Sequence, residues 1–404
     1  MSVTNCVLVL NAGSSSLKFK IYRSLQASGA HIEARGQIEG IGSAATFAAR
    51  DSVDRPLESA TLVDVHDAGT ALIALAHWLR SRFHHLRVIG VGHRVVHGGS
   101  QCKPSIVTPT LIQELRSLIP LAPLHQPHSI AAIEAVTERL PGVPQVACFD
   151  TSFHRTQPRV ATLVPLPREI RSLGVQRYGF HGLSYEYIAS VLPRIAPKVA
   201  DGRVIIAHLG SGASLCALKQ RKSVDCTFGF TALDGLCMGT RPGAVDPGVI
   251  LYLFQQLRMT SEEVETILYK RSGLLGISEI SNDMRILLAS SDPNAQLALD
   301  YFVFRVTKEI GALTAILGGL DAVVFTAGVG ERSAEIRDRI CHSSAWLGID
   351  MDPQANVRGD LRISRESSPV SAWIIPTDEE LMIALHTGAV LGRVETPAPE
   401  PTAG

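Results

Sequence analysis

Cysteine is scarce and unpaired in this sequence. The 404 residues include 7 cysteines, an odd number, and no two of them form a CxxC motif. We therefore expect neither a disulfide framework nor a zinc site built from thiolates. The first residues also lack the basic segment and the long apolar segment of a secretory signal. These absences predict a cytoplasmic protein in a reducing compartment.

The chain also has a formal net charge of zero. The 38 Lys and Arg residues balance 38 Asp and Glu residues, so the chain lacks a broad positive field and we expect no nucleic-acid partner. Only 8 of the 38 basic residues are lysines. An excess of arginine is compatible with two-point binding of small anions. Genome composition also produces such an excess, and we favour that explanation.

No uninterrupted apolar run is long enough to span a membrane. The best candidate, residues 310–330, is broken by Asp321 and by several glycines. We interpret this segment as a buried helix followed by a strand, and we expect no membrane partner.

Apolar periodicity and boundary signals predict alternating helices and strands. Helices are predicted over residues 68–83, 109–119, 128–139, 260–273, 292–317 and 377–391. The last of them is predicted to begin with a capping box of Thr377 and Glu380. Strands are predicted over 88–91, 143–149, 204–207, 322–326 and 372–375. This alternation indicates an α/β fold, and the Pro- and Ala-rich segment 397–404 is predicted to be disordered.

The two halves of the chain begin alike. Residues 6–11 are an apolar run that leads into a Gly-Ser turn and a second run at 17–21. Residues 204–208 lead in the same way into a Gly-Ser turn and a run at 215–218. Each pattern predicts two strands joined by a tight turn. The similarity indicates an internal duplication only weakly, because such turns are common.

Three small-residue segments could let backbone amides approach phosphate oxygens. They are Asn11–Lys18, His208–Ser214 and Phe325–Glu331. In the first, Lys18 adds a positive charge, but the Walker A pattern is absent. A plain hairpin turn explains the first two segments at least as well. The third leads from a strand toward a helix predicted from about Ser333, where anions are favoured; an ordinary loop is the alternative.

Five charged or titratable residues stand out by their position. Glycines flank Arg94 and Arg241, which favours site loops whose guanidinium groups bind carboxylate or phosphate; for Arg94 a surface ion pair is the alternative. Asp150 follows a strand, where ligands gather in α/β sheets, although turn residues stand there too. His181 is either an oxyanion donor or a core histidine. Glu379 is either a metal ligand or a helix-dipole residue.

No single motif decides the function, but the set is informative. Glycine turns, two glycine-flanked arginines and single carboxylates at strand ends suit phosphoryl transfer with Mg²⁺. That reaction depends on positioning and charge neutralisation more than on covalent chemistry.

At these residues the sequence closely resembles the acetate and propionate kinase family of the sugar kinase/Hsp70/actin superfamily. The resemblance covers about residues 5–391. The matching stretches are NAGSSSLKF, GHRVVHGG, APLH, FDTSFH, RYGFHG, GTRPG, SGLLGIS, ISNDMR, FTAGVGE and IPTDEEL. Each is weak alone, but together they are highly specific.

The resemblance implies two ribonuclease-H-like (actin-like ATPase) domains in duplicate, with a nucleotide cleft between them. The first would comprise residues 1–151 plus 381–396, and the second residues 152–380. Members are homodimers that use ATP/ADP as co-substrate and Mg²⁺ as metal, with Mn²⁺ able to replace it. The implied reaction is direct in-line transfer of the γ-phosphoryl group of ATP to acetate, giving acetyl phosphate and ADP.

The resemblance also assigns catalytic and metal roles. Asp150 matches the catalytic carboxylate, and His181 and Arg241 match the residues that stabilise the transition state. Asn11 and Glu379 match the magnesium-associated pair.

Substrate positions follow in the same way. Arg94 matches the contact to the substrate carboxylate, and Val96, Leu124 and Phe180 match the apolar pocket for its methyl group. Lys18 matches the phosphate-proximal lysine. The other nucleotide-binding positions would be His208, Leu209, Gly210, Ser211 and Gly212; Asp283, Met284 and Arg285; and Gly328, Val329, Gly330, Glu331 and Arg332.

Elementary chemistry agrees with these roles. Carboxylic acids titrate near pH 4, so acetate is already an anion at pH 7 and needs no general base. We therefore expect Asp150 to orient the magnesium shell or a water. Arg94, Arg241, His181 and Mg²⁺ would offset the repulsion between the acceptor anion and the polyphosphate.

Several positions depart from the family pattern. They are Gln126, Leu183, Tyr185, Ser211, Ala232, Asp234, Ala244 and Arg332. Ser211 and Arg332 bear on nucleotide affinity and purine preference. Ala232 stands where the family has proline and would loosen the acyl pocket, but one or two methylenes are worth only about 1–3 kcal/mol. Propionate is thus a candidate substrate, whereas Val96 narrows the pocket and favours acetate.

Three alternatives remain. The first is the same chemistry on propionate or butyrate. The second is a non-catalytic nucleotide switch of the actin/Hsp70 kind, and the third is a sugar kinase with Asp150 as base. Arg94 and Arg241 favour a carboxylate acceptor over the last two.

Overall fold

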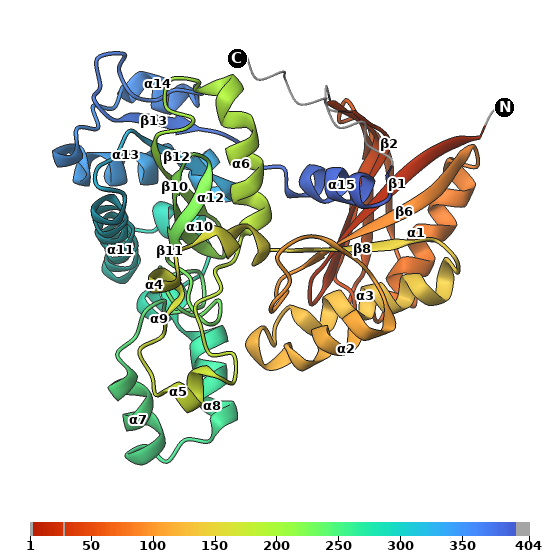
Figure 1. Cartoon of the computed structure of the whole chain (residues 1–404), viewed down its shortest axis with the longest axis horizontal. Coiled ribbons are helices and arrows are strands. Elements are labelled where there is room, and N and C mark those ends of the chain that lie inside the picture. The colour runs from red at the N-terminus through yellow and green to blue at the C-terminus, as the bar shows by residue number, and fades with distance from the viewer. Residues whose placement is uncertain (1–2, 27–28, 393–404) are drawn as a thin grey trace, which may run out of the picture. The chain divides into compact units, whose positions relative to one another are not determined.

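The structure is a computed structural model that describes residues 3–26 and 29–392 (Figure 1). The chain divides into two compact units. Unit 1 comprises Met1–Ser152 and Asp378–Gly404, and unit 2 comprises Phe153–Thr377. The tail expected at 397–404, and residues 393–396 of the segment expected to end the first domain, lie outside the described residues.

Unit 1 is built on an eight-stranded mixed sheet with the order β5-β4-β3-β2-β1-β6-β8-β7. β1 is antiparallel to β2 and parallel to β6, and β6 is parallel to β8. The strands are β1 (Thr4–Ala12), β2 (Ser16–Gln26), β3 (Gly29–Glu39), β4 (Thr46–Asp51), β5 (Pro56–Thr61), β6 (Leu86–Val95), β7 (Ser105–Ile106) and β8 (Gln145–Phe149).

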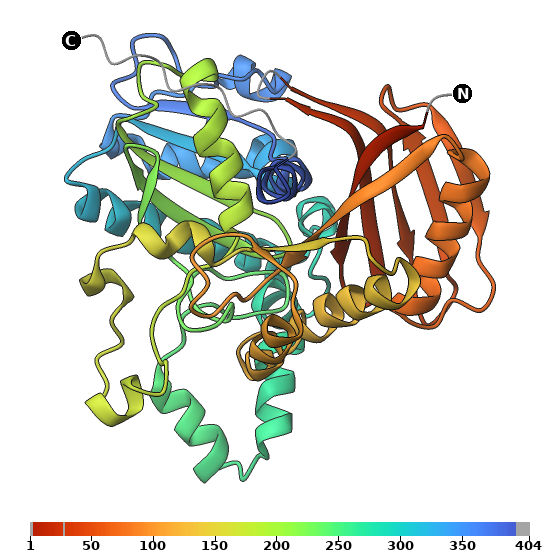
Figure 2. The ribbon, with the colours of Figure 1, turned by 45° about the vertical axis from the view of Figure 1, so that its right-hand side comes forward.

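Helices cover both faces of this sheet. They are α1 (Ala68–Arg82), α2 (Pro109–Ser117), α3 (Gln126–Arg139) and α15 (Glu379–Val390). On one face, Leu8 and Leu10 of β1 pack in a core with Leu72 and Leu75 of α1. α15 packs against β1, β6 and β8, and Figure 2 shows it across the sheet from α1.

Two glycines of β6 bring α15 close to the sheet. Gly90, Gly92 and Arg94 alternate along the strand and so share one face. A Cβ at Gly92 would lie 2.3 Å from Thr387 Oγ1, and one at Gly90 would lie 2.4 Å from Leu391 Cδ1. The helix therefore lies directly on the strand backbone, and its N-terminus is held beside Arg94.

This close approach gives a stability prediction. Gly92→Ala is expected to lower the free energy of unfolding by about 1–3 kcal/mol, because the new methyl group must push α15 away. Gly328→Ala is the matched control, since a Cβ there meets no atom within 4 Å. Urea unfolding of both variants checks the prediction, and equal stability of the two would contradict it.

Unit 2 is built on a five-stranded sheet with the order β11-β10-β9-β12-β13. Its strands are β9 (Arg203–Leu209), β10 (Ala213–Lys219), β11 (Lys222–Cys226), β12 (Ala322–Thr326) and β13 (Ser371–Ile374). Its helices are α4 (Arg159–Thr162), α5 (Arg168–Arg171), α6 (Gly182–Ile195), α7 (Pro247–Gln255), α8 (Ser261–Thr266), α9 (Gly273–Ser278), α10 (Met284–Ala289), α11 (Pro293–Leu317), α12 (Ala327–Arg332), α13 (Ala334–Ser343) and α14 (Pro353–Arg358). Figure 1 shows α6 and α11 on opposite sides of this sheet.

The two units repeat one topology. In unit 1 the series β3-β2-β1-β6-β8 has two antiparallel pairings followed by two parallel ones. The series β11-β10-β9-β12-β13 of unit 2 has the same senses in the same order. Both hairpins that the sequence predicts are present, with Ala12 opposite Leu17 and Leu209 opposite Ala213. The weak sequence signal for a duplication is therefore confirmed.

The interpretation of residues 310–330 is also confirmed. α11 ends at Leu317 and β12 begins at Ala322. Over the described residues, no helix is long and apolar enough to cross a membrane.

Some predicted boundaries are wrong. β6 continues through Val95, so Arg94 lies on a strand and not in a loop. The N-cap of α15 is Asp378, whose side chain accepts from the Leu381 amide, in place of the predicted Thr377. The helix predicted from about Ser333 is preceded by α12, which starts directly after β12.

The helix predicted over 260–273 is interrupted. α8 has the predicted capping box of Thr260 and Glu263 but ends at Thr266, and a π-helical turn continues to Arg271. Gly273 then opens α9 with a φ of +66°. A Cβ at this glycine would lie 2.1 Å from the Met238 carbonyl oxygen. The missing side chain therefore lets the loop that contains Met238 pass close to the break in the helix.

Candidate active site

Arg94 is the centre of a charged cluster in unit 1. Its Nε donates to Asp150 Oδ1 at 3.2 Å, and its Nη2 donates to Asp150 Oδ2 at 2.7 Å. Its Nη1 lies 3.2 Å from Glu379 Oε2. Asp150 is 1% exposed and follows β8 directly, as the sequence predicts. Because guanidinium has five N–H groups, donor capacity remains at Nη1 and Nη2 for a further anion.

The β1–β2 hairpin adds further polar groups to this face of unit 1. Asn11 pairs with Lys18 across the hairpin, and the charge of Lys18 acts on Glu379. Lys20 donates to Asp378 Oδ1 at 2.7 Å and lies 3.3 Å from Glu380 Oε2. The hairpin is thereby tied to the first turn of α15.

Carboxylates outnumber cations in this cluster. Burial is the main reason that the pKa of Glu379 rises to about 7, and the negative charges of Asp150 and Glu380 raise it further. Arg94 and Lys18 act in the opposite direction but do not restore the ordinary value. Glu379 is thus a carboxylate that a further cation would stabilise.

The donor set fits Mg²⁺ rather than a soft metal. Amide and carboxylate oxygens of Asn11, Asp150 and Glu379 are hard ligands, and Mg²⁺ usually takes only one or two carboxylates together with waters and substrate phosphates. Over the described residues there is no group of three His, Cys, Asp or Glu side chains arranged to hold a metal. The residues therefore suit a magnesium ion that arrives with phosphate.

Arg241 lies in a tightly anchored loop of unit 2. The amides of Ser272, Leu274 and Leu275 donate to carbonyl oxygens of residues 238–240 at 2.9–3.0 Å. Arg241 Nη1 donates to the Ala232 carbonyl oxygen at 2.7 Å. This contact is made by the backbone, so it does not depend on the residue type at position 232.

The environment of Arg241 is opposite in charge to that of Arg94. Burial lowers the pKa of Arg241 to about 10, whereas the carboxylates around Arg94 raise the pKa of that residue. Within residues 3–26 and 29–392 no carboxylate lies within 4.0 Å of the Arg241 guanidinium. A buried cation that lacks a negative partner is a site prepared for an anion.

Two histidines and a glycine accompany Arg241. A Cβ at Gly212 would lie 2.8 Å from Arg241 Nη2 and 3.3 Å from His181 Nε2. The His181 ring stacks on His208 with a centroid distance of 4.0 Å. His181 has a left-handed φ of +58° at the N-cap of α6, a conformation that costs energy and often marks functional residues. The structure therefore brings Gly212, His181, His208 and Arg241 together.

Hydroxyl groups orient both histidines. Ser214 Oγ lies 2.9 Å from His181 Nδ1, and Ser184 Oγ lies 2.8 Å from His208 Nδ1. Tyr185 also bonds to Ser214. The sequence analysis assigns no site role to Ser184, Tyr185 or Ser214, although Ser214 ends the predicted glycine segment and Tyr185 departs from the family pattern.

The other predicted nucleotide residues lie in three places. Residues 208–212 end β9 and form the hairpin turn, with the Leu209 side chain buried and Ser211 exposed. Asp283 caps α10 and pairs with Arg285. The Arg285 guanidinium lowers the pKa of Asp283 to about 2. Met284 is buried.

The third segment, Gly328–Arg332, is helical and not the predicted loop. Glu331 Oε1 accepts from the amides of Ala327 and Thr377, at 2.8 and 3.2 Å. In this arrangement the Glu331 carboxylate is bound to backbone amides. The buried Arg337 donates to the carbonyl oxygens of Gly330 and Glu331, so it fixes the end of α12, a role that the sequence analysis missed.

The three residues predicted for the acyl pocket belong to different units. Val96 is buried and Leu124 is half-buried in unit 1, whereas Phe180 is buried in unit 2, where it packs edge-on against Phe228.

The chain is similar to known proteins over almost its whole length. The sequence model of the acetokinase family matches residues 6–385. The acetate kinase of Rhodopseudomonas palustris is 51% identical over 389 residues, which are 95% of this chain and 98% of the relative. The chain also covers 100% of two solved structures, which cover 96% of it. They are the acetate kinase of Porphyromonas gingivalis, with 35% identity and a TM-score of 0.84, and a propionate kinase of Francisella tularensis, with 34% identity and a TM-score of 0.88.

The matches extend over both units and over every segment that carries a predicted site residue. The identities are well above the level at which only a fold is shared. The chain therefore belongs to the acetokinase family, whose members are kinases that phosphorylate a carboxylate.

Proposed function

We propose that this protein transfers the γ-phosphoryl group of ATP to acetate, reversibly and with Mg²⁺. The observation that carries the proposal is the contrast between its two arginines. Arg94 lies in an acid-rich cluster with spare donors, and Arg241 is buried with no carboxylate partner among the residues that the structure describes. Phosphoryl transfer between two anions needs both a metal-binding set of carboxylates and an uncompensated positive charge.

In unit 1, we assign the acceptor carboxylate to Arg94. Asp150 holds the guanidinium through both of its oxygens, so its main role is to position Arg94. Because acetate is already ionised at pH 7, no proton has to be removed from it. Asp150 is then available to orient a metal-bound water, and it need not act as a base.

In unit 2, we assign charge stabilisation to Arg241 and His181. Both side chains face Gly212, whose lack of a Cβ leaves room for an anion. Residues 208–212 and Lys18 are assigned to the phosphates, and segments 283–285 and 328–332 to the adenosine side.

We assign the metal to Asn11 and Glu379, whose oxygens are hard donors. When bound, Mg²⁺ neutralises phosphate charge and orients the transferred group. The positive charge of the ion would then offset the burial and the neighbouring carboxylates that raise the pKa of Glu379.

The acceptor test uses purified protein with ATP, Mg²⁺ and hydroxylamine, which traps acyl phosphates as coloured hydroxamates. Acetate is expected to give the strongest signal, because Val96 narrows the apolar pocket. Butyrate and glycerol serve as controls for chain length and for a hydroxyl acceptor. Release of ADP with glycerol but without hydroxamate would identify a sugar kinase, and ATP binding without any product would identify a switch.

Propionate is the second candidate acceptor. Ala232 stands where a family proline would restrict the acyl pocket, and one solved neighbour is a propionate kinase with a TM-score of 0.88. A larger kcat/KM for propionate than for acetate would select this candidate, while both results leave the mechanism unchanged.

We also propose a homodimer that is formed through α7. This helix contains no charged residue and none of its residues is buried, with Leu251 55% and Tyr252 54% exposed. It borders a groove that is also lined by residues 163–165, and Leu163 and Leu166 are exposed as well. Contiguous exposed apolar surface of this kind indicates a protein interface.

The dimer prediction concerns Leu251→Glu. The wild-type protein is expected to sediment at about twice the chain mass of 43.4 kDa, and the variant at 43.4 kDa, because a charge would be buried in the interface. Leu297→Glu on α11 is the control, since Leu297 is 57% exposed and lies outside α7. A dimeric Leu251→Glu protein would remove α7 from the interface.

We further propose that units 1 and 2 are the two domains expected from the sequence and that the protein works in the cytosol. All seven cysteines lie within the described residues, and none of them forms a disulfide there; Cys102 is exposed and the other six are buried, which is compatible with a reducing compartment.

A further inference from the structure

Unit 1 contains an apolar cavity that the proposed reaction does not use. Its volume is about 410 Å³, and it lies between the sheet and α1. Cys6 and Leu8 of β1 form its floor, and Leu72 and Leu75 of α1 form its roof. These four side chains are at most 3% exposed. The size is within the range of small-molecule sites, about 300–1,000 Å³, and such sites are mostly apolar.

The mouth of the cavity is lined by basic side chains. Among the residues that line it, the polar ones at the surface are Arg80 and His84, which are both exposed. In the part of the chain that the structure describes, neither of them forms an ion pair. Arg82, His85 and Arg87 follow in the same segment, and the sequence has no Asp or Glu from residue 68 to residue 113.

We propose that this cavity binds a medium-chain fatty-acid anion, with the aliphatic chain inside and the carboxylate at Arg80 and His84. The lining is aliphatic except for Cys6, Phe83 and the polar residues at its edge, which suits an unbranched alkyl chain. The cationic mouth supplies the charge complementarity for a carboxylate. This site is independent of the proposed kinase reaction.

The energetics of an apolar cavity support a ligand of this class. Empty apolar space lowers stability in proportion to its volume, and dry apolar cavities bind hydrocarbons. Water gains little there, because the floor and roof offer it no hydrogen-bond partner other than the weak thiol of Cys6. An alkyl chain would recover the lost contacts of the lining side chains.

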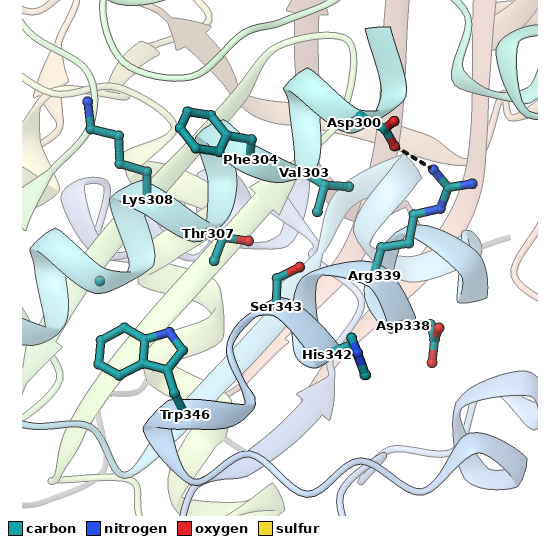
Figure 3. Close-up of a pocket in the computed structure, with 11 residues that line it drawn as sticks. Asp300, Val303, Phe304, Thr307, Lys308, Asp338, Arg339, His342, Ser343 and Trp346 are labelled. Carbon is teal, nitrogen blue, oxygen red and sulfur yellow. Dashed lines mark hydrogen bonds and ion pairs between the residues drawn. The ribbon is translucent and has the colours of Figure 1, made fainter. Parts of the chain in front are cut away.

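The larger hollow between α11 and α13 has a different character. It measures about 700 Å³ and is lined by charged residues of both signs. Figure 3 shows Arg339 turned toward Asp300, and the two side chains are 3.2 Å apart. Because Arg339 already pairs with Asp300 and Glu335, and because the lining holds charges of both signs, this hollow does not have the purely basic rim that Arg80 and His84 form.

The test measures thermal unfolding and calorimetric binding with sodium decanoate, kept below its micelle concentration. Saturating ATP and acetate are present, so that the kinase site is occupied. Decanoate at about 100 times its Kd is expected to raise the unfolding midpoint by about 5 °C. Decanol, which has the same chain without the charge, is expected to bind about tenfold more weakly.

Two variants locate the site. Ala76→Phe fills the cavity from α1 and is expected to abolish binding of both compounds, whereas Ala131→Phe on an exposed position of α3 should leave binding intact. The double variant Arg80→Gln, His84→Gln should weaken decanoate about tenfold and leave decanol unchanged. All four positions lie outside the kinase site, so hydroxamate formation reports whether each variant is folded.

Three results would overturn the proposal. They are the absence of any shift with decanoate, an unchanged shift in a folded Ala76→Phe protein, and equal affinities for decanoate and decanol. The last result would leave an apolar cavity without selectivity for an anion.

Discussion

Arg241→Ala is expected to lower kcat by about 10²–10⁴, which is the scale of losing one preorganised donor to the transition state. The guanidinium is buried, its pKa is lowered to about 10, and its hydrogen bond goes to the neutral Ala232 carbonyl oxygen. Because no carboxylate neutralises it among the described residues, its charge is available to the transferred phosphoryl group. Steady-state kinetics of acetyl phosphate formation measure the loss.

The structure also makes this variant easy to interpret. Removing Arg241 leaves no buried carboxylate of the described residues unpaired, so a large fall in stability is not expected. Arg94→Ala would instead leave Asp150, which is 1% exposed, without its ion-pair partner. The effects of that variant on kinetics and on folding would therefore be mixed. Arg241→Lys keeps a point charge without the planar fork and should recover part of the loss.

Arg221→Ala is the matched control for the same substitution. Arg221 is exposed and pairs with Asp201 at 2.8 Å, and surface pairs of this kind contribute little. Its kcat should equal that of the wild-type protein. A kcat for Arg241→Ala within threefold of wild type would contradict the assigned role.

The sequence predicts the local features of the fold well. Apolar runs locate β1, β9 and β12, and Asp150 is found at the end of β8, because these features depend on neighbouring residues. The glycine turns at 13 and 210 are correctly identified as hairpins. The equal topology of the two units is indicated only faintly, since the pairing of strands depends on contacts between distant residues.

The site itself depends on contacts that no local pattern contains. Glu379 lies beside Arg94 because Gly90 and Gly92 admit α15, and these residues are far apart in the sequence. A capping box at Thr377 satisfies the local rule, yet Asp378 caps the helix and also bonds to Lys20. A tertiary partner thus decides between two acceptable local solutions.

A sequence motif also does not show whether a charged side chain has a partner of opposite charge. Arg94 and Arg241 have the same glycine-flanked signature in the sequence. The structure gives one of them two carboxylates and the other a carbonyl oxygen. The resemblance to a family names both residues, but the difference in their surroundings is visible only in the structure.

Glu379→Gln is expected to lose at least about 100-fold in activity while unfolding at a higher temperature than wild type at pH 8. The pKa of Glu379 is about 7 in the folded protein against an ordinary value of 4.5, chiefly because of burial. The folded state therefore binds the proton more tightly than the unfolded state. The contribution of Glu379 to wild-type stability is greatest below about pH 4.5 and is lost as the pH rises through 7, whereas glutamine does not titrate.

The gain of the variant should thus be largest at pH 8, at most about 3 kcal/mol for a shift of this size, and should vanish near pH 4.5. Unfolding is measured in a chelator, so that no metal occupies the site. Adding Mg²⁺ should then stabilise the wild-type protein more than the variant. A variant that is less stable than wild type at pH 8 would contradict the raised pKa.

Glu380→Gln provides a control of opposite sign one residue away. Burial opposes ionisation of Glu380, but the Lys20 ammonium at 3.3 Å and hydrogen bonds outweigh it and lower the pKa. Its contribution to stability is therefore present above about pH 4.5 and is lost as the pH falls through the folded pKa. Glutamine at 380 should destabilise the protein at pH 8, where glutamine at 379 stabilises it. Opposite shifts from the same substitution would show that the two carboxylates in the first turn of α15 have different roles. Glu380 stabilises the fold, whereas ionised Glu379 destabilises the metal-free protein and is available to a cation.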